Sequence, residues 1–275
     1  MPIGVPSRQC AKAVVLARGL GTRMRHGDES ARLTHPQAAA AQQGFKALMP
    51  LDRPFIDYLL GALAQAGYRR VCLVVAPEHE AIREHIARLQ PRRISVDLAV
   101  QDEPRGTADA VAAARSFAGD DEFLCVNGDN HYPVAVLRRL RELDGPGLAA
   151  YTREGLLRGN IPPERISKFA VLELSDRNAL RRIIEKPSDE QIRRLGEPLL
   201  VSMNCWRLGP RIFDACRQVA PSPRGELELP DAVQRAIDAG EVFRAVVVEE
   251  PVLDLSSRSD VAELTRRLAG TPVEL

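Results

Sequence analysis

Residues 13–24 of the chain read AVVLARGLGTRM and give its strongest indication of fold. The uninterrupted apolar run at 13–17 predicts a buried strand, and the glycine-rich segment at 18–24 predicts a loop that leaves it. Such a loop lets backbone N–H groups approach a phosphate closely. Met24 stands where a third glycine would complete a dinucleotide fingerprint, and no Gly-Lys-Ser/Thr follows as in a P-loop. The stretch therefore predicts a phosphate-binding turn of another kind.

Outward from this turn, strand-like and helical patterns alternate. Strands are expected at 13–17, 70–76, 94–100 and 123–127, and helices at 54–66, 78–89, 107–117 and 134–143. The second half is more mixed, with strands at 148–151, 168–174, 200–206 and 242–248 and helices at 210–219, 230–239 and 258–268. Strands separated by helices of this length are typical of βαβ units. We expect an α/β fold, Rossmann-like, with a mixed, mostly parallel sheet flanked by helices in a single domain over residues 1–275.

Residues 25–44, RHGDESARLTHPQAAAAQQG, interrupt this alternation with a polar, alanine-rich insert beside the phosphate loop. The insert lacks the periodicity of a core element, so a surface loop or a short surface helix is expected. A mobile lid over the phosphate loop is the alternative interpretation.

Composition excludes several classes of protein. The formal net charge is +1, 45% of the residues are hydrophobic, and no run approaches the length of a membrane span. We therefore expect no nucleic-acid partner and no membrane partner. The N-terminal residues lack a secretory signal, which favours a cytoplasmic protein. Five cysteines, an odd number with no CxxC pair, favour buried thiols in a reducing compartment over disulfides or zinc.

Six segments in order give the chain a specific resemblance. They are LARGLGTRM at 16–24, FKALMP at 45–50, QDEPRGTA at 101–108, NGDN at 127–130, EKP at 185–187 and VLDLSS at 252–257. Together they resemble the signature of the sugar-phosphate nucleotidylyltransferases (nucleotide-sugar pyrophosphorylases), and in particular glucose-1-phosphate thymidylyl- and uridylyltransferases. The resemblance covers residues 13 to about 265. It implies transfer of a nucleotidyl group from an NTP to a sugar 1-phosphate, giving an NDP-sugar and pyrophosphate, and it leaves a homo-oligomer open.

The resemblance also implies roles for individual residues. Arg23 and Lys46 would be catalytic, and Asp129 and Asp254 would bind Mg²⁺. The nucleotide would lie against Ala17, Gly19, Gly21, Thr22, Gln101, Gly106 and Thr107, and the sugar phosphate against Glu185, Lys186 and Asn204. The chemistry agrees with this set. A phosphate monoester is largely dianionic near neutral pH, so it needs cations and positioning more than a general base. Gln101 could read a base edge through its amide donor and acceptor, and Gly106 could let the base approach the backbone.

The sequence departs from the family pattern at several positions. Arg18 replaces one residue of the usual Gly-Gly pair, Phe45 replaces a proline, and Ser256-Ser257 replace Gly-Thr. Ala170 stands where many members have a glycine that contacts the sugar. These departures leave the base and the sugar open. They also leave an alternative function open: the chain could be a catalytically weak regulatory protein that binds a nucleotide or sugar phosphate. A dinucleotide-binding oxidoreductase is the more distant alternative.

Overall fold

A computed structural model describes residues 10–28 and 31–275 of the chain. Its strands are β1 (Lys12–Leu16), β2 (Arg70–Val75), β3 (Ser95–Val100), β4 (Phe123–Asn127), β5 (Asn130–His131), β6 (Gly147–Thr152), β7 (Val171–Leu174), β8 (Leu180–Ile184), β9 (Leu200–Leu208), β10 (Arg244–Val248) and β11 (Leu253–Asp254). The helices before the fifth strand are α1 (Thr22–Arg25), α2 (His35–Gln43), α3 (Phe55–Ala66), α4 (Glu80–Leu89), α5 (Thr107–Ala113) and α6 (Arg115–Ala118). Those after it are α7 (Val134–Arg141), α8 (Arg153–Leu157), α9 (Pro163–Ile166), α10 (Asp189–Leu195), α11 (Ile212–Gln218), α12 (Leu229–Asp238) and α13 (Asp260–Leu268).

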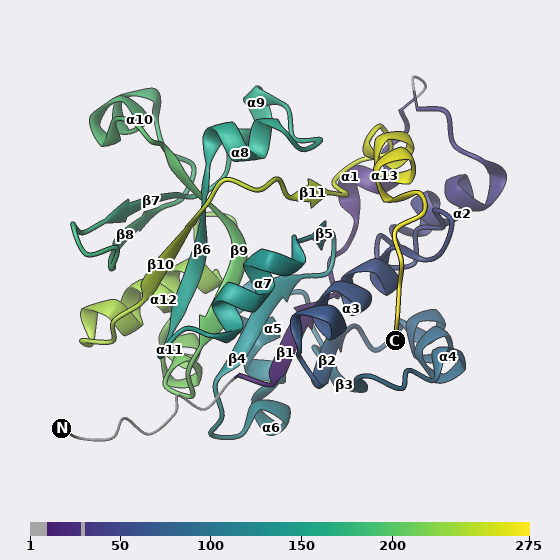
Figure 1. Cartoon of the computed structure of the whole chain (residues 1–275), viewed down its shortest axis with the longest axis horizontal. Coiled ribbons are helices and arrows are strands. Elements are labelled where there is room, and N and C mark those ends of the chain that lie inside the picture. The colour runs from purple at the N-terminus through teal and green to yellow at the C-terminus, as the bar shows by residue number, and fades with distance from the viewer. Residues whose placement is uncertain (1–9, 29–30) are drawn as a thin grey trace.

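The central sheet has the order β10-β6-β9-β4-β1-β2-β3, and β7 and β8 extend it beside β9 (Figure 1). The pairs β1–β2, β1–β4, β2–β3 and β6–β10 are parallel, whereas β9 runs antiparallel to both β4 and β6. The fold class expected from the sequence is therefore confirmed. Strand β1 lies inside the sheet with parallel neighbours on both sides, so the loop that leaves it emerges where the carboxyl ends of strands converge.

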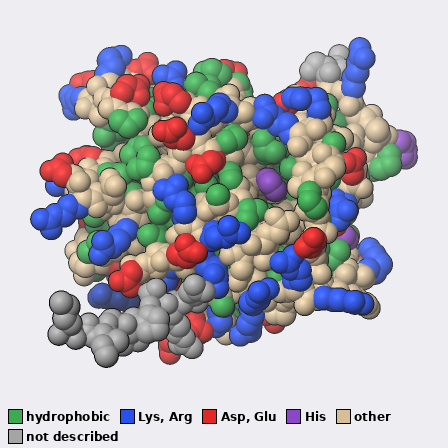
Figure 2. Space-filling view, viewed as in Figure 1, with side chains coloured by type: hydrophobic (Ala, Val, Ile, Leu, Met, Phe, Trp, Pro, Cys, Tyr) green, Lys and Arg blue, Asp and Glu red, His purple; other side chains and the backbone are tan. Residues whose placement is uncertain are grey.

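Helices cover both faces of the sheet (Figure 1). On the face shown in Figure 2, basic and acidic side chains are interspersed with apolar ones. One core cluster joins the sheet to α3, α4 and α7, and a second joins the opposite face to α5, α11 and α12. A third, smaller cluster joins α2 and α13 through side chains such as Ala41 and Leu264. The C-terminal segment crosses from β10 through β11 to place α13 beside α1 (Figure 1). In the described ranges, none of the helices has both the length and the apolar character that a membrane crossing requires.

Three local expectations need correction. The helix expected at 107–117 is interrupted at Ala114, which separates α5 from α6. The strand expected at 168–174 begins only at Val171, because Lys168 and Phe169 close a turn onto α9. Strand β8 was not expected at all. It carries two exposed arginines in its centre and has no apolar alternation, so only its pairing with β7 reveals it.

The insert at 25–44 contains helix α2. A short surface helix was one of the two forms expected from the sequence, the other being a surface loop. Thr34 and Gln37 form a capping box at the start of α2, and Gly44 ends the helix in the left-handed conformation. Gln37 and Ala41 are buried against the body of the protein. The mobile-lid alternative is not tested by this geometry, and residues 29–30 of the insert lie outside the described residues.

Candidate active site

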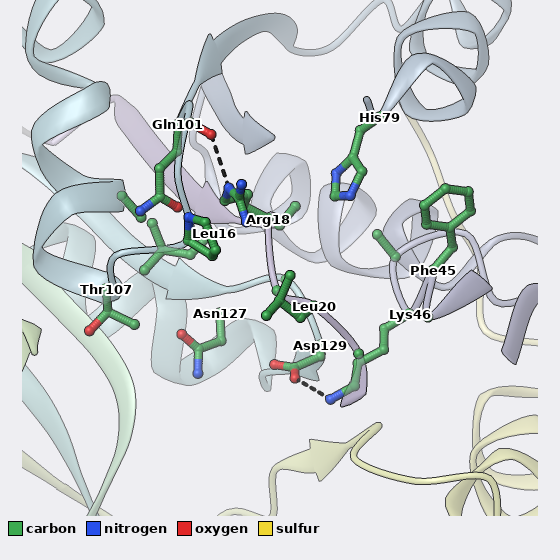
Figure 3. A pocket seen from close by; sticks show the side chains of 18 of the residues that line it. Leu16, Arg18, Leu20, Phe45, Lys46, His79, Gln101, Thr107, Asn127 and Asp129 are labelled. Atoms are coloured by element: carbon green, nitrogen blue, oxygen red, sulfur yellow. Dashed lines mark hydrogen bonds and ion pairs between the residues drawn. The ribbon is translucent and has the colours of Figure 1, made fainter. Parts of the chain in front are cut away.

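A cavity of about 350 Å³ opens where the loops after β1, β3 and β4 meet (Figure 3). Gln101 and Thr107 lie on one side of it, and Lys46 and Asp129 point toward each other on another. Nine of the predicted residues line this cavity: Ala17, Gly19, Gly21, Thr22, Lys46, Gln101, Gly106, Thr107 and Asp129. Segments that are far apart in sequence thus meet around one space, at the position in an α/β sheet where ligands usually bind.

Gly19 and Gly21 of the phosphate loop differ in the space that a side chain would have. Gly21 has a φ of 61°, and a Cβ there would lie 2.3 Å from the carbonyl oxygen of Gly44, so only glycine fits. Gly19 has nothing within 4 Å of a Cβ position. The open space beside Gly19 faces the cavity, which leaves its backbone accessible to a ligand.

Lys46 and Asp129 form the central ion pair of the cavity. Lys46 Nζ lies 2.9 Å from Asp129 Oδ2 (Figure 3), and both side chains are only partly exposed. Lys46 comes from the segment after α2, and Asp129 from the turn between β4 and β5. The Lys46 ammonium group and the Asp129 carboxylate therefore lie side by side at the edge of the phosphate loop.

Asp254 reaches the same place from the other end of the chain. The short strand β11 pairs with β5, which sets Asp254 opposite Asn130, and the Leu255 N–H donates to the carbonyl of Asp129 at 2.8 Å. The Asn130 amide donates to Asp254 Oδ1 at 3.1 Å. Burial, and then the neighbouring Asp129 carboxylate, raise the pKa of Asp254 to about 7. The Asp254 carboxylate is thus buried close enough to Asp129 for their charges to interact, although Asp254 itself does not line the cavity.

A buried polar network holds Asp254 in place. Asn160 accepts from the Asp254 N–H and donates to the Asp254 carbonyl, both at 2.8 Å. Arg165 lies 3.6 Å from Asp254 and forms a two-point ion pair with Asp260 at 2.9 and 3.0 Å. Asp260 also accepts from the backbone N–H of Ser257. No motif or spacing in the sequence indicates that Asn160 and Arg165 lie beside this segment.

The two carboxylates could hold a divalent cation together with a phosphate-bearing ligand. Within residues 10–28 and 31–275, no three His, Cys, Asp or Glu side chains gather into a cluster that could hold a metal by themselves. Mg²⁺, however, is commonly bound through one or two carboxylates, with substrate phosphates and water completing its shell. Asp129 and Asp254 fit that requirement, because a bound cation would offset both the burial of the Asp254 carboxylate and its repulsion from Asp129, the two effects that raise its pKa most.

Arg23 does not line the cavity. It lies in α1, and its Nη1 donates to Ser256 Oγ at 3.0 Å. The arginine therefore contacts the segment that follows Asp254, at the position where the family pattern has Gly-Thr.

Gln101 and Gly106 line the cavity and also make contacts within the protein that the sequence did not indicate. The Gln101 side-chain nitrogen donates to the Gly106 carbonyl at 3.0 Å and to Asp109 at 2.8 Å, so only its carbonyl oxygen is left to read a base. Gly106 has a φ of 118°, and a Cβ there would lie 2.4 Å from the carbonyl oxygen of Leu227. Contact with the protein's own backbone therefore already requires a glycine at this position, and the predicted approach of a base to Gly106 stays a prediction.

The three predicted sugar-phosphate residues lie outside the lining of this cavity. Glu185 and Lys186 follow β8, and Asn204 lies in β9. Lys186 and Asn204 have φ values of 45° and 50°, which are rare for residues other than glycine and are often found at functional sites. Tyr132 links Asn204 to the carboxylate side, since its hydroxyl group contacts the carbonyl of Asn204 at 3.4 Å and the Asn130 side chain at 3.3 Å.

Burial, followed by the nearby Glu228 carboxylate, raises the pKa of Glu185, whereas Arg224 and Lys186 lower it. Glu226, two residues before Glu228, lines the cavity. The segment from Arg224 to Glu228 thus connects the Glu185 side with the cavity. Sequence reasoning did not select it.

Three further residues of the cavity wall were not among the predicted site residues. Arg18 is only 7% exposed, and it donates to the backbone carbonyls of Gln101 and Asp102. The rings of Phe45 and His79 meet edge to face, with their centroids 5.4 Å apart. Arg18 and Phe45 stand out in the sequence as departures from the family pattern, whereas nothing local marks His79.

Comparison with known proteins identifies the family. A family model described as nucleotidyl transferase matches residues 12–263. The chain belongs to the nucleotidyl transferase family. It is 32% identical over 261 residues to a glucose-1-phosphate thymidylyltransferase of Streptomyces griseus, a match that covers 94% of this chain and 66% of that protein. It is 27% identical over 260 residues to the UTP–glucose-1-phosphate uridylyltransferase AglF of Haloferax volcanii, covering 94% of this chain and 96% of the relative.

A solved structure supports the fold. The crystal structure of a UDP-glucose pyrophosphorylase complexed with UDP-glucose matches with a TM-score of 0.74 and 17% identity, covering 96% of this chain and 100% of the other. The chain spans slightly less than two thirds of the length of the Streptomyces relative, so the latter has residues beyond the matched part.

Proposed function

We propose that this protein transfers a nucleotidyl group from an NTP to a sugar 1-phosphate, giving an NDP-sugar and pyrophosphate. The observation that carries the proposal is the meeting of Lys46, Asp129 and Asp254 beside a glycine-rich phosphate loop, although these residues come from three distant segments. The family and its named relatives support the same reaction.

In the proposed reaction a phosphate oxygen of the sugar 1-phosphate attacks the α-phosphorus of the NTP. A new P–O bond forms, the bond between the α-phosphorus and the bridging oxygen breaks, and pyrophosphate leaves with that electron pair. The attacking oxygen is already deprotonated near neutral pH, so no side chain needs to remove a proton. The protein's task is to bring two anions together and to offset their charge.

In this proposal, different residues of the cavity contact the triphosphate and the base of the NTP. Ala17, Gly19, Gly21 and Thr22 would present the loop to the triphosphate, and Lys46 would move from Asp129 toward the phosphates. Gln101 would accept a hydrogen bond from the base through its carbonyl oxygen, with Gly106 and Thr107 fixing that segment.

The remaining roles belong to residues around the cavity. Arg23 would offset charge from its position beside Ser256. Glu185, Lys186 and Asn204 would hold the sugar phosphate. Asp129 and Asp254 would ligate Mg²⁺, which when bound supplies positive charge to the reacting phosphates. In this scheme the family departures at Arg18 and Ser256-Ser257 change the surroundings of the reaction, and its central charged groups are all present.

A matrix of common NTPs against a panel of sugar 1-phosphates, with pyrophosphate release as the readout, tests the proposal. We expect one pair of substrates to stand out, and Asp129→Asn to lose at least about a hundred-fold in turnover, the scale of several kcal/mol of lost charge stabilisation. Asp176→Asn, on an exposed turn, is the matched control that should retain full activity.

A second candidate is favoured by the departures at Arg18 and Ser256-Ser257: a nucleotide- or sugar-phosphate-binding regulatory protein with negligible turnover. Saturable NTP binding without pyrophosphate release from any pair in the matrix would support this candidate and contradict the enzymatic proposal.

A further inference from the structure

Strand β3 forms one free edge of the central sheet (Figure 1). It pairs only with β2 among the described residues. The N–H groups of Ser95 and Gln101 donate to β2 or to the residue before it, so the alternate residues Val96, Leu98 and Val100 direct their backbone N–H and C=O groups away from the sheet. These outward groups form a ready template for another strand.

The edge lacks most of the features that usually protect such a strand, and Asp97 is the one charged residue within it. Residues 95–100, SVDLAV, contain no lysine and no proline, and their register with β2 has no bulge. Leu98 and Val100 are 38% and 44% exposed, which makes them two of the few large apolar side chains on the described surface. Asp97 points to the other face and lies 3.6 Å from Arg70. The apolar side chains and the unpaired backbone groups therefore coincide on one edge.

We propose that β3 pairs antiparallel with β3 of a second copy of this chain, about a two-fold axis at Leu98. The outward N–H and C=O groups of Val96, Leu98 and Val100 determine which residues of the two strands pair. Leu98 would exchange both backbone hydrogen bonds with Leu98 of the second copy, and Val96 would do so with Val100 of the second copy. Val96, Leu98 and Val100 share one face of the strand, so the pairing lays the exposed apolar side chains against their own copies.

The charges at the two ends of β3 favour pairing with β3 of a second copy of this chain over pairing with a different protein. Arg92 and Arg93 precede the strand, Asp102 and Glu103 follow it, and all four are exposed. Within its own chain Arg93 also pairs with Glu274, and Glu103 lies 3.9 Å from Arg105. In an antiparallel pair the start of each strand lies beside the end of the other, so each basic pair would meet an acidic pair at both ends of the interface. A parallel arrangement would instead set like charges together.

Cross-linking at the axis gives a direct test. The five native cysteines are all buried, so Leu98→Cys would introduce one exposed thiol at the two-fold axis. We expect a short bismaleimide to convert Leu98→Cys into a covalent dimer at twice the 30.3 kDa of the chain. Leu157→Cys is the matched control, because Leu157 is 42% exposed on α8 and would remain uncross-linked.

Light scattering on uncross-linked protein completes the test. We expect the unmodified chain to be a dimer and Leu98→Arg to be a monomer whose circular dichroism spectrum is that of the folded chain, because the substituted side chain is already exposed. If Leu98→Arg fails to fold, the cross-linking result decides alone. A monomer at every concentration, or a dimer that cross-links through Leu157→Cys and not through Leu98→Cys, would overturn the proposal.

Discussion

At the scale of single residues, Arg18 shows how one side chain can join two functional loops. Its Nε donates to the carbonyl of Gln101 at 2.9 Å, and its Nη2 donates to the carbonyl of Asp102 at 3.1 Å. The arginine thus ties the phosphate loop to the segment proposed to read the base.

We expect Arg18→Lys to raise the KM for the NTP about ten-fold or more, because a lysine cannot reproduce both bonds, and a hydrogen bond to a charged group contributes roughly 1.5–3 kcal/mol. The KM for the sugar 1-phosphate should change little. Steady-state kinetics check both values, with Arg105→Lys on the exposed part of the same segment as control. An unchanged KM for the NTP would contradict this role.

Substitutions of Lys46 and Lys186 should change different kinetic parameters. Lys46 is proposed to meet a triphosphate whose charge is rearranged in the transition state, so Lys46→Ala should mainly lower kcat. Lys186 is proposed to hold the sugar phosphate throughout, so Lys186→Ala should raise the KM for that substrate by roughly ten-fold. Initial-rate kinetics with each substrate varied separate the two effects. If Lys186→Ala leaves the sugar-phosphate KM unchanged, the EKP segment is only a turn.

His79 gives a pH dependence to stability. Its Nδ1 accepts a hydrogen bond from the Ala76 N–H at 3.3 Å, which fixes the neutral ring. Burial lowers its pKa below the ordinary value of 6.5, and the charges around it add smaller effects. Arg18, Arg83 and Arg25 lower the pKa further, and Glu78 raises it.

The sign of the effect follows from proton uptake. As the pH falls below about 6.5, His79 binds a proton in the unfolded chain before it does so in the folded one, so the folded state loses stability. We expect the unfolding free energy of the wild type to fall more steeply than that of His79→Gln between about pH 7 and 5. Urea unfolding at a series of pH values measures this. Parallel curves for the two proteins would contradict the shift.

At the scale of elements, α2 shows how a polar insert acquires structure. Its sequence supplies a capping box at Thr34 and a glycine at the C-cap, but only Gln37 and Ala41 are buried. The helix is therefore held by its caps and by a small contact with the third core cluster, whereas most of its surface remains exposed.

The lid hypothesis makes a prediction for the loop that precedes α2. Arg32 is exposed there, and trypsin should cleave after it more slowly when NTP and Mg²⁺ are present, because ordering over the phosphate loop would hide the bond. Cleavage after Arg177, on the exposed turn between β7 and β8, is the internal control. Equal rates at Arg32 with and without nucleotide would favour a static surface helix.

At the scale of the whole molecule, a buried arginine and its half-buried carboxylate partner join three parts of the fold. Arg207 in β9 is only 2% exposed, and it donates to Glu122, which precedes β4, at 2.9 and 2.5 Å. It also donates to the carbonyls of Leu140 and Arg141 at the end of α7. The charge therefore stabilises the junction between the antiparallel β9 and the parallel part of the sheet.

Glu122→Gln should leave Arg207 buried without a counter-charge, at a cost of about 3 kcal/mol in unfolding free energy, near the lower end for a broken buried pair. That corresponds to a fall of roughly 5–10 °C in Tm. Glu84→Gln, which breaks an exposed pair with Arg88, should cost less than about 1 kcal/mol. Calorimetry on both variants checks the difference, and equal losses would contradict the importance of burial.

The sequence by itself determined most of the local elements and the position of the glycine-rich loop after β1. The apolar run of β1, the periodicity of α3 and the ordered segments of the family signature depend on neighbouring residues, so they can be read without coordinates. The same holds for Lys46, Asp129 and Asp254 as candidates, because each lies within a recognisable segment.

Only the tertiary structure decided which of these groups meet. Asp254 acquires its raised pKa because β11 pairs with β5 and buries it beside Asp129, and no spacing along the chain specifies that pairing. Strand β8 and the Arg165 contact arose in the same way, from partners distant in sequence. Burial and charge proximity depend on which surfaces pack together, and packing is a property of the whole chain rather than of any one segment.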